Sequence, residues 1–377
     1  QETPKIALVH DHLIQDGGAE RVLRVLSSMY PEAPIFTLVH DKERFKGLEN
    51  VDVRTSFIQK LPFGMKKFEW FLPLMPSATE HYNLSGFDVV ISSTSAMAKG
   101  VITATHAKHV CYCHTPTRYL WTDTHTYIRD LKIPGIVKAF LPTFLSVLRG
   151  WDRIAAERVD HFVANSNTVS KRIERYYQKN SSIIYPPVDT HLFSISDRPK
   201  EYFLAGGRIA AYKRFDLIVE AFNRTGLPLV IFGDGPFLDE LKMRARSNIT
   251  FLGRVSDAEK ADLYQDCIAY LNPQVEDFGI TAVEAMASGR PVIAFGKGGA
   301  KETVVPGTPG TFFAEQTWES LADTLVRFDE AQFDPAEIRA HAEQFSVDRF
   351  KRQMRTLVDE VSGMPTGQTS FIEEALT

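Results

Sequence analysis

Short apolar segments, each followed by a loop and a helical pattern, recur through the first half of the chain and begin again in the second half. Lys5–His10 opens the first series, and Tyr202–Ala205 opens the second. Strands that alternate with helical patterns are typical of parallel sheets. The stiff Pro186-Pro187 pair lies between the two series. The sequence therefore predicts two α/β domains and a C-terminal helix with a frayed tail. Their residue ranges are 1–186, 187–345 and 346–377.

Length and composition narrow the class of protein. A chain of 377 residues is long for one core, and 44% hydrophobic with 24% charged residues is typical of a soluble globular protein. The net charge of -4 argues against a general nucleic-acid binder. No apolar run approaches the roughly 20 residues that cross a bilayer, and the N-terminus runs straight into a strand, so we expect neither a membrane span nor a signal peptide. Cys111, Cys113 and Cys267 give no disulfide framework, which fits a reducing cytosol.

Two acids follow one of the buried strands in the second series. Glu276 lies in the loop after the strand Ala269–Asn272, and Glu284 lies within the helix that begins near Ile280. The N–H groups of Gly279 and Ile280 are expected at the helix N-terminus, which suits a phosphate. Acids beside an anion site fit the hydroxyl groups of a sugar and a ribose joined by a diphosphate. The alternative is a loop acid and a solvated helix acid without a common role.

A glycine pair follows the first strand of the chain. Gly17 and Gly18 open a helix directly after the loop, an arrangement that can bind an anion. The pair has neither the Lys-Ser/Thr of a Walker A loop nor the full dinucleotide fingerprint. A tight turn without a ligand is the alternative.

A histidine ends another strand of the first series. His114 lies after His109–Cys113 and before a proline turn, so the topology predicts that it faces the ligand crevice. The alternative is that His114 is a structural residue, because a lone histidine usually forms its hydrogen bonds with its neighbours. Cys111 and Cys113 share one face of the strand, and we expect them to pack rather than to hold a metal.

Basic residues follow the first strand of the second series. Arg208 and Lys213 lie in the loop that enters the next helix, where two cations could neutralise a diphosphate. The alternative is that Arg208 and Lys213 are solvated loop residues without a ligand. The turn Gly233-Asp234-Gly235-Pro236 and the segment Ile249–Val255 follow along the chain.

Taken in order, these motifs resemble the retaining glycosyltransferases of family 4. The acid pair fits the family's E-x7-E signature, and Arg208 with Lys213 fits its Gly-Arg-x4-Lys diphosphate clamp. The resemblance implies the GT-B fold, in which two Rossmann-like domains face one another across a cleft and the C-terminal helix crosses back to the N-terminal domain. The first domain would bind the acceptor, and the second would bind the nucleotide sugar.

The resemblance also implies a role for each site residue. Glu276 would bind hydroxyls of the transferred sugar, Glu284 the ribose, and His114 would position the sugar or stabilise its developing charge. The expected catalytic residues are Glu276, His114, Arg208 and Lys213. The expected donor-binding residues are Gly17, Gly18, Arg208, Lys213, Arg254, Val255, Phe278, Gly279, Ile280 and Glu284. Neither a metal nor a cofactor is implied, apart from the nucleotide-sugar donor as co-substrate.

The run His-Thr-Pro-x-Arg-Tyr-x-Trp at His114–Trp121 looks like bacterial mannosyltransferases that build O-antigen and exopolysaccharide. That likeness implies transfer of mannose from GDP-mannose to a lipid-linked or oligosaccharide acceptor. The cysteines favour a cytoplasmic protein, and the segment over residues 60–75 would place it at the inner face of the cytoplasmic membrane. A transferase that uses a UDP-sugar, a GT-B nucleotide-sugar epimerase and a catalytically silent binding subunit stay open as alternatives.

The segment over residues 60–75 differs in composition from the rest of the chain. Large aromatic residues there interleave with Lys60, Lys66 and Lys67. Such a pattern is typical of a segment that lies on anionic lipid. A loop that packs its aromatic residues onto the core is the equal alternative.

Overall fold

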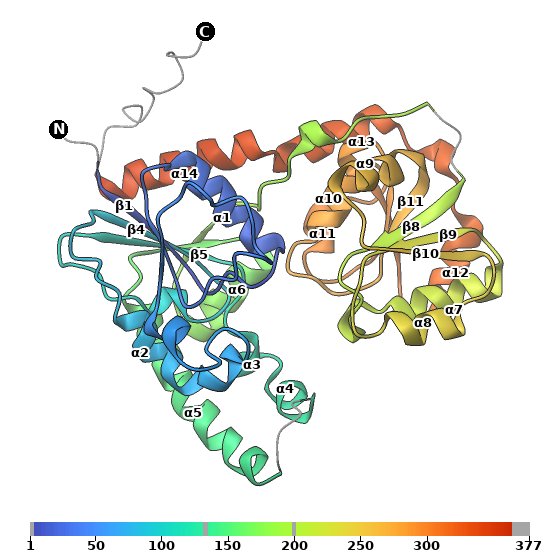
Figure 1. Cartoon of the computed structure of the whole chain (residues 1–377). Helices are drawn as coiled ribbons and strands as arrows, with labels where there is room; N and C mark the ends of the chain where they lie inside the picture. The colour runs from blue at the N-terminus through green and yellow to red at the C-terminus, as the bar shows by residue number, and fades with distance from the viewer. Residues whose placement is uncertain (1–3, 131–134, 198–200, 364–377) are drawn as a thin grey trace. The chain divides into compact units, whose positions relative to one another are not determined.

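The computed structural model describes residues 4–130, 135–197 and 201–363. The chain divides into two compact units (Figure 1). Unit 1 is the chain up to Tyr185 together with the residues from Phe350 onward, and unit 2 is Pro186–Arg349. The predicted frayed tail, from residue 364 onward, lies outside the described residues.

The described part of unit 1 contains a seven-stranded parallel sheet with the order β3-β2-β1-β4-β5-β6-β7. The strands are β1 Ile6–His10, β2 Ile35–Thr37, β3 Val53–Thr55, β4 Val89–Thr94, β5 Lys108–Cys113, β6 His161–Ala164 and β7 Ser181–Ile183. From β1 the chain first adds strands on one side, and then returns to add β4 on the other side. The edge strand β7, just before the Pro186-Pro187 pair, was not predicted from the sequence.

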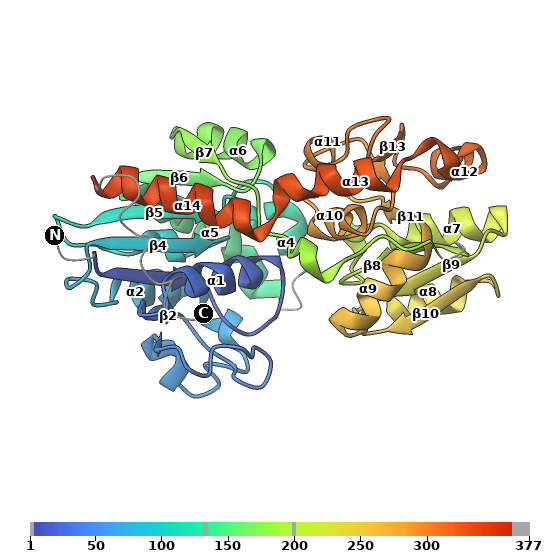
Figure 2. The ribbon, with the colours of Figure 1, turned by 90° about the horizontal axis from the view of Figure 1, so that it is seen from above.

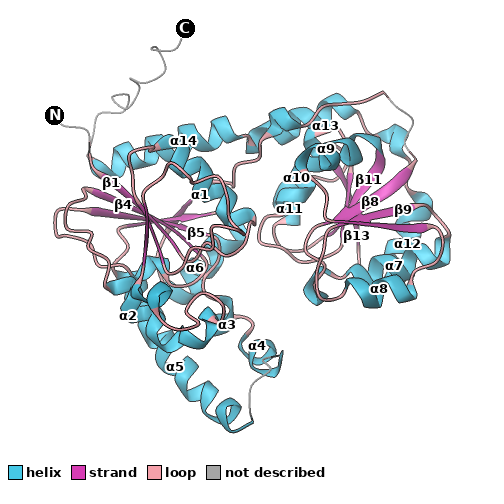
Figure 3. Ribbon diagram, in the orientation of Figure 1, coloured by secondary structure: helices cyan, strands magenta, loops and turns pink. Residues whose placement is uncertain are grey.

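Helices lie on both faces of this sheet (Figure 3). The described helices of the unit are α1 Gly18–Met29, α2 Met75–Glu80, α3 Arg118–Trp121, α4 Thr124–Asp130, α5 Gly135–Glu157, α6 Asn167–Tyr177 and α14 Val347–Ser362, with the 3-10 turns η1 Phe57–Lys60, η2 Phe68–Leu74 and η3 Ala98–Gly100. Side chains alternate between the two faces of a strand. Accordingly Val110 packs with α1 and α14, while Cys111 and Cys113 pack with α6 in a separate cluster.

The C-terminal helix belongs to the core of the first unit. Phe350, Met354 and Leu357 of α14 pack with Leu8 of β1 and Leu23 of α1 in one buried cluster. Figure 2 shows α14 running along the sheet beside α1. The expected return of the last helix to the N-terminal domain is confirmed.

Unit 2 repeats the architecture with a six-stranded parallel sheet of order β10-β9-β8-β11-β12-β13 among its described residues. The strands are β8 Tyr202–Gly206, β9 Leu229–Phe232, β10 Ile249–Gly253, β11 Cys267–Asn272, β12 Val292–Phe295 and β13 Gly310–Phe313. The helices are α7 Phe215–Thr225, α8 Leu238–Arg244, α9 Asp257–Asp266, α10 Ile280–Ala287, α11 Ala300–Thr303, α12 Trp318–Arg327 and α13 Pro335–Ala342, with η4 Thr190–Leu192, η5 Ala211–Lys213, η6 Glu330–Gln332 and η7 Glu343–Phe345. Helices α7, α8 and α12 pack on one face of the sheet (Figure 1). Two parallel Rossmann-like sheets are therefore present, as predicted.

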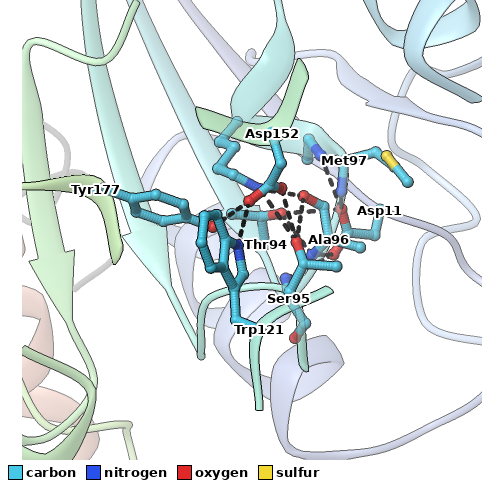
Figure 4. Close-up of polar contacts among 11 residues, drawn as sticks. Asp11, Thr94, Ser95, Ala96, Met97, Trp121, Asp152 and Tyr177 are labelled. Atoms are coloured by element: carbon cyan, nitrogen blue, oxygen red, sulfur yellow. Dashed lines mark hydrogen bonds and ion pairs between the residues drawn. The ribbon is translucent and has the colours of Figure 1, made fainter. Parts of the chain in front are cut away.

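A buried ion pair joins η3 to α5 in unit 1. The Nζ of Lys99 lies 2.5 Å from Oδ1 of Asp152, and both side chains are almost fully buried. Thr117, Trp121 and Tyr177 also donate hydrogen bonds to the Asp152 carboxylate (Figure 4). Burial opposes the charge on Lys99, but Asp152 outweighs this effect and raises the lysine pKa. The pair is thus a fully satisfied polar centre within an apolar layer.

Removal of one partner should leave an uncompensated buried charge. We expect Asp152→Ala to lower the free energy of unfolding by about 3–5 kcal/mol. The matched control is Asp52→Ala, which breaks the exposed ion pair with Arg54 and should cost less than about 1 kcal/mol. Urea denaturation followed by circular dichroism measures both variants. Equal losses in the two variants would contradict the expectation.

Candidate functional site

Each unit has one place where the strand order reverses, between β1 and β4 in unit 1 and between β8 and β11 in unit 2. Ligands of open parallel sheets bind at the carboxyl ends of the strands beside such a reversal. The loop after β1 carries Gly17, the loop after β8 carries Arg208 and Lys213, and the loop after β11 carries Glu276. His114 follows β5, the neighbour of β4. The candidate residues therefore form two groups, one in each unit.

In unit 2 the structure brings Lys213 and Glu276 into direct contact. Lys213 ends η5, and its Nζ pairs with Oε1 of Glu276 across the reversal between β8 and β11. The two side chains are 19% and 13% exposed, so the pair is partly shielded but still open to solvent. An acceptor and a cation thus lie side by side at the edge of the sheet where a ligand is expected.

Glycines hold the Glu276 loop in place. Gly299 N donates to the Glu276 carbonyl oxygen at 2.7 Å, so the loops after β11 and β12 are joined. Gly298 has φ +65°, and a Cβ there would lie 2.5 Å from that carbonyl oxygen. Gly279 has φ +95° and caps α10, and a Cβ there would lie 3.1 Å from Oε2 of Glu276. A side chain at either position would therefore displace the acid.

The start of α10 lies where the sequence predicted it. Ile280 is the first residue of the helix, so its N–H group is among the first-turn donors that lack intrahelical partners. Phe278 is buried and packs edge-on against Phe345, with the ring centroids 5.4 Å apart. The preceding phenylalanine thus anchors the loop to the core, while the helix N-terminus stays available to an anion.

Glu284 lies one turn into α10 and is only 2% exposed. Its carboxylate accepts a hydrogen bond from Lys260 Nζ at 3.1 Å and one from Tyr264 OH at 3.0 Å. Both donors come from α9 and were not foreseen from the sequence, because nothing in the α9 segment shows that it packs against α10. Each carboxylate oxygen has two lone pairs, so these donors do not exhaust its capacity to accept.

The remaining donor-binding candidates of unit 2 lie on loops beside β9 and β10. Arg208 is exposed, and the next residue, Ile209, donates its N–H to the Asp234 carbonyl oxygen at 2.9 Å. Arg254 is 85% exposed and pairs with the Asp234 carboxylate at 3.1 Å. Val255 and Arg254 line a cavity of about 360 Å³, within the usual range for ligand pockets. The other lining residues are Tyr202, Leu252, Glu259, Asp262, Leu263 and Asp266.

In unit 1 the glycine pair is built into the start of α1. Gly17 is the N-cap and Gly18 the first helical residue. Gly17 N donates to Oε2 of Glu20 at 2.9 Å, in the manner of a capping box. Burial opposes ionisation of Glu20, but the hydrogen bond and charge of His10 outweigh burial and hold its pKa at about 2. The helix start therefore carries a buried carboxylate at neutral pH.

His114 is almost buried, at 9% exposure. Its backbone N–H and its carbonyl oxygen are both hydrogen-bonded. Its N–H donates to the Thr94 carbonyl oxygen, and its carbonyl oxygen accepts from Asn165 Nδ2, each at 2.9 Å. Its Nε2 lies 2.8 Å from Ser93 Oγ, and its ring packs edge-on to Tyr112. The imidazole thus has a fixed orientation.

Asp11, directly after β1, is a structural member of the site that sequence reasoning missed. It accepts from the hydroxyl of Thr94 and from four backbone N–H groups, those of Ser95, Ala96, Met97 and Ala98, at 2.6–3.0 Å (Figure 4). Burial opposes its ionisation, but His10 and these N–H donors lower its pKa. An acid one residue beyond an apolar strand was the available signal.

Cys111 and Cys113 are buried in an apolar cluster with Ala156 and Ile173. Burial raises the pKa of the Cys111 thiol to about 12, so it is protonated at neutral pH. Among the residues that the structure describes, no group of three or more His, Cys, Asp or Glu side chains is arranged to hold a metal ion.

Two family models match the chain. The model of glycosyl transferases group 1 matches residues 192–345, and that of glycosyltransferase family 4 matches residues 16–192. The chain belongs to glycosyltransferase family 4. The enzymes of this family are retaining glycosyltransferases, and the matches cover both units that carry the two groups of candidate residues.

Curated relatives of this glycosyltransferase include two mannosyltransferases. The alpha-1,3/1,6-mannosyltransferase of Dictyostelium discoideum is 23% identical over 329 residues, 72% of this chain and 75% of that protein. The O-antigen chain mannosyltransferase C of Escherichia coli is 29% identical over 186 residues, 45% of this chain and 48% of that protein.

Solved structures support the GT-B fold. The sucrose-phosphate synthase of Thermosynechococcus elongatus matches with a TM-score of 0.74 at 17% identity, over 96% of this chain and 100% of that one. The Anabaena protein HepE, solved in complex with UDP, matches with a TM-score of 0.70 at 18% identity, over 94% of this chain and 100% of that one.

Proposed function

We propose that this glycosyltransferase transfers mannose from GDP-mannose, with retention, to a lipid-linked or oligosaccharide acceptor in the synthesis of a bacterial cell-surface polysaccharide. The observation that carries the proposal is the Lys213–Glu276 pair at the strand reversal of unit 2. The cation suits the donor diphosphate, and the carboxylate suits hydroxyls of the transferred sugar.

In the proposed reaction the donor diphosphate is held by Arg208, Lys213 and the N–H groups at Gly279 and Ile280. The C1–O bond to the diphosphate breaks, and its electron pair leaves with the phosphate oxygen. The acceptor hydroxyl bonds to C1 on the same face and passes its proton to that oxygen. Side-chain cations stabilise the leaving group, so the proposed reaction needs no metal.

The other site residues bind the rest of the donor in this proposal. Glu284 accepts from the ribose hydroxyls, with Lys260 and Tyr264 holding its carboxylate in place. His114 binds the transferred sugar and stabilises its developing positive charge as a neutral imidazole. Gly17 and Gly18 leave room for the donor phosphates and the acceptor at the start of α1.

Two observations support this donor. Mannosyltransferase relatives match the chain, which supports mannose as the sugar. The cavity beside Arg254 and Val255 is lined by the acids Glu259, Asp262 and Asp266, which supports guanine as the base. Carboxylates accept hydrogen bonds, and the N1–H and N2–H₂ groups of guanine are donors. A UDP-sugar is the second candidate donor, because HepE was solved with UDP.

The segment over residues 60–75 supports a membrane-surface role at the cytoplasmic face. Phe68 packs in the core of unit 1, whereas Phe63 and Trp70 are each 67% exposed. Lys67 Nζ lies 3.9 Å from the Trp70 ring centroid, so aromatic and cationic groups share one surface. Exposed aromatic residues with lysines suit anionic lipid, the surface at which a lipid-linked acceptor is found. None of the described helices is long and apolar enough to cross a bilayer.

Alanine variants of the ion pair test the chemistry. We expect Lys213→Ala and Glu276→Ala each to lower kcat/KM roughly 10²–10³-fold, because each removes a group that acts on the reacting centre. The double variant should lose less than the product of the single losses, since the two side chains interact. Release of nucleoside diphosphate measures the rate, and NMR of the product measures retention. Lys242→Ala, at an exposed lysine of α8, is the control; near-normal rates in both single variants would refute the assignment.

Nucleotide binding tests the donor. In a thermal-shift panel of GDP, UDP, ADP, GDP-mannose, UDP-glucose and UDP-N-acetylglucosamine, we expect stabilisation by GDP and GDP-mannose alone. A ligand at 100 times its Kd should stabilise the fold by about 2.7 kcal/mol, which is readily measured. A shift confined to uridine nucleotides would replace mannose by the second candidate donor.

Flotation with lipid vesicles tests the membrane contact. We expect the protein to float with anionic vesicles and not with zwitterionic ones, and Trp70→Ser with Phe63→Ser to abolish flotation. Val326→Ser removes an apolar side chain that is 73% exposed on unit 2 and should leave flotation unchanged. Absence of the native protein from the anionic vesicles would refute the contact.

A further inference from the structure

One buried side chain at the strand reversal of unit 2 carries an unused hydrogen-bond donor. Asn272, the last residue of β11, is fully buried. Gln274 Nε2 donates to its Oδ1 at 2.6 Å. Its Nδ2 has no hydrogen-bond partner among the residues that the structure describes. A buried amide donor without a partner costs free energy, and a leucine of similar size would avoid that cost. The amide therefore indicates a state of the protein in which Nδ2 gains an acceptor.

The fold places this donor beside Glu276. Leu271 packs in the cluster that α7 and α8 cover, and the next residue of a strand points to the opposite face. Asn272 therefore lies on the face where Figure 1 shows α10. A Cβ on Gly279, at the start of α10, would lie 3.8 Å from Asn272 Nδ2 and 3.1 Å from Glu276 Oε2. A donor and an acceptor thus approach one point, which the glycine leaves open.

We propose that Asn272 is a positioning residue, which binds the Glu276 carboxylate when Lys213 turns from Glu276 to the donor diphosphate. The part that the diphosphate plays rests on the proposed function. The contact between Asn272 and Glu276 after loss of the lysine does not.

The exchange follows from the charges of the three groups. Lys213 pairs with Oε1 of Glu276, whereas Oε2 is the oxygen on the Gly279 side. A diphosphate carries more negative charge than one carboxylate and competes with it for the lysine. The acid that has lost its cation needs another donor to keep its orientation. Rotation of the Glu276 side chain brings Oε2 to Asn272 Nδ2, so the carboxylate stays fixed at the sheet edge.

The chemistry of the amide determines which of its atoms faces the acid. A carboxylate oxygen can only accept, so it repels an amide oxygen and attracts an amide nitrogen. Gln274 donates to Oδ1 and holds that oxygen on the other side. Gly279 has φ +95°, and any side chain there would stand between Asn272 and Glu276. The proposed contact therefore needs both the amide and the glycine.

Nitrogen-15 NMR of the full chain labelled at asparagine tests the exchange through the side-chain amide of Asn272. In Lys213→Ala the acid loses its cation. We therefore expect one Nδ2 proton to move to higher frequency without any nucleotide, because a hydrogen bond to a carboxylate is a strong one. In the native protein the same change should follow addition of GDP or UDP, whichever raises the melting temperature. Asn272→Leu assigns the signal, and Lys213→Met repeats the measurement with a longer uncharged side chain.

Two controls accompany the NMR. Addition of Glu276→Ala to Lys213→Ala removes the acceptor and should return the Asn272 signal to its native position. Asn223 of α7 donates through Nδ2 to the Arg244 carbonyl oxygen at 2.8 Å, and its signal should not move. An unmoved Asn272 signal in both lysine variants would overturn the inference, and so would an unmoved signal in the native protein with a nucleotide that binds.

Kinetics provide the second readout. Asn272→Leu removes one hydrogen bond to a charged group, so kcat should fall about 10–100-fold, with the Kd of the nucleoside diphosphate within about twofold. In a Glu276→Gln background the same substitution should cost much less, because Asn272 acts through that acid. Asn248→Leu is the matched control. It removes an amide that donates to the carbonyl oxygens of Phe222 and Leu227 before β10, so it should lower stability and leave kcat unchanged.

The outcomes separate this inference from the proposed function. Equal losses of kcat from Asn272→Leu in the native and Glu276→Gln backgrounds would overturn the inference. The expected NMR changes in a protein that transfers no sugar would uphold the contact between Asn272 and Glu276 and refute the proposed function. If neither GDP nor UDP binds, the proposed function fails, and the two Lys213 variants alone decide whether the contact forms.

Discussion

The buried carboxylate of Asp11 is the interaction on which unit 1 depends. Five hydrogen bonds tie it to Thr94–Ala98, so the loops after β1 and β4 behave as one piece at the reversal of the sheet. A carboxylate with that many donors offsets the cost of its own burial. The same contacts fix the residue that follows Ala98, Lys99, which reaches Asp152 on α5. They also fix the end of β4, where Ser93 Oγ lies within hydrogen-bond distance of His10 and His114.

The sequence was sufficient to place Glu276, Lys213 and His114 on loops at one edge of each sheet, because parallel strands with short apolar patterns end at that edge. It was not sufficient to pair Lys213 with Glu276, since that contact depends on the turn at η5 and on the close approach of Gly298. The partners of Glu284 and the role of Asp11 likewise arise from tertiary packing. Strand β7 was missed because Ser181–Ile183 is short and lacks apolar alternation.

The two units use one topology for different chemistry. At the reversal of unit 1 the polar groups are acids and imidazoles, bound to one another and to backbone N–H groups. At the reversal of unit 2 the loops carry the cations Arg208 and Lys213 and a helix N-terminus at Gly279. This asymmetry fits the proposed function, in which the positive groups of unit 2 hold the donor diphosphate.

The contribution of α14 to the core of unit 1 affects how the chain can fold during synthesis. Phe350, Met354, Leu357 and Val358 complete a cluster whose other buried members precede Tyr185. At roughly 5–20 residues per second, a ribosome needs on the order of ten to thirty seconds to make the intervening segment. Throughout that interval the apolar surface around Leu8 and Leu23 lacks its cover. The first half of the polypeptide is therefore a natural client for chaperones until the last helix emerges from the exit tunnel.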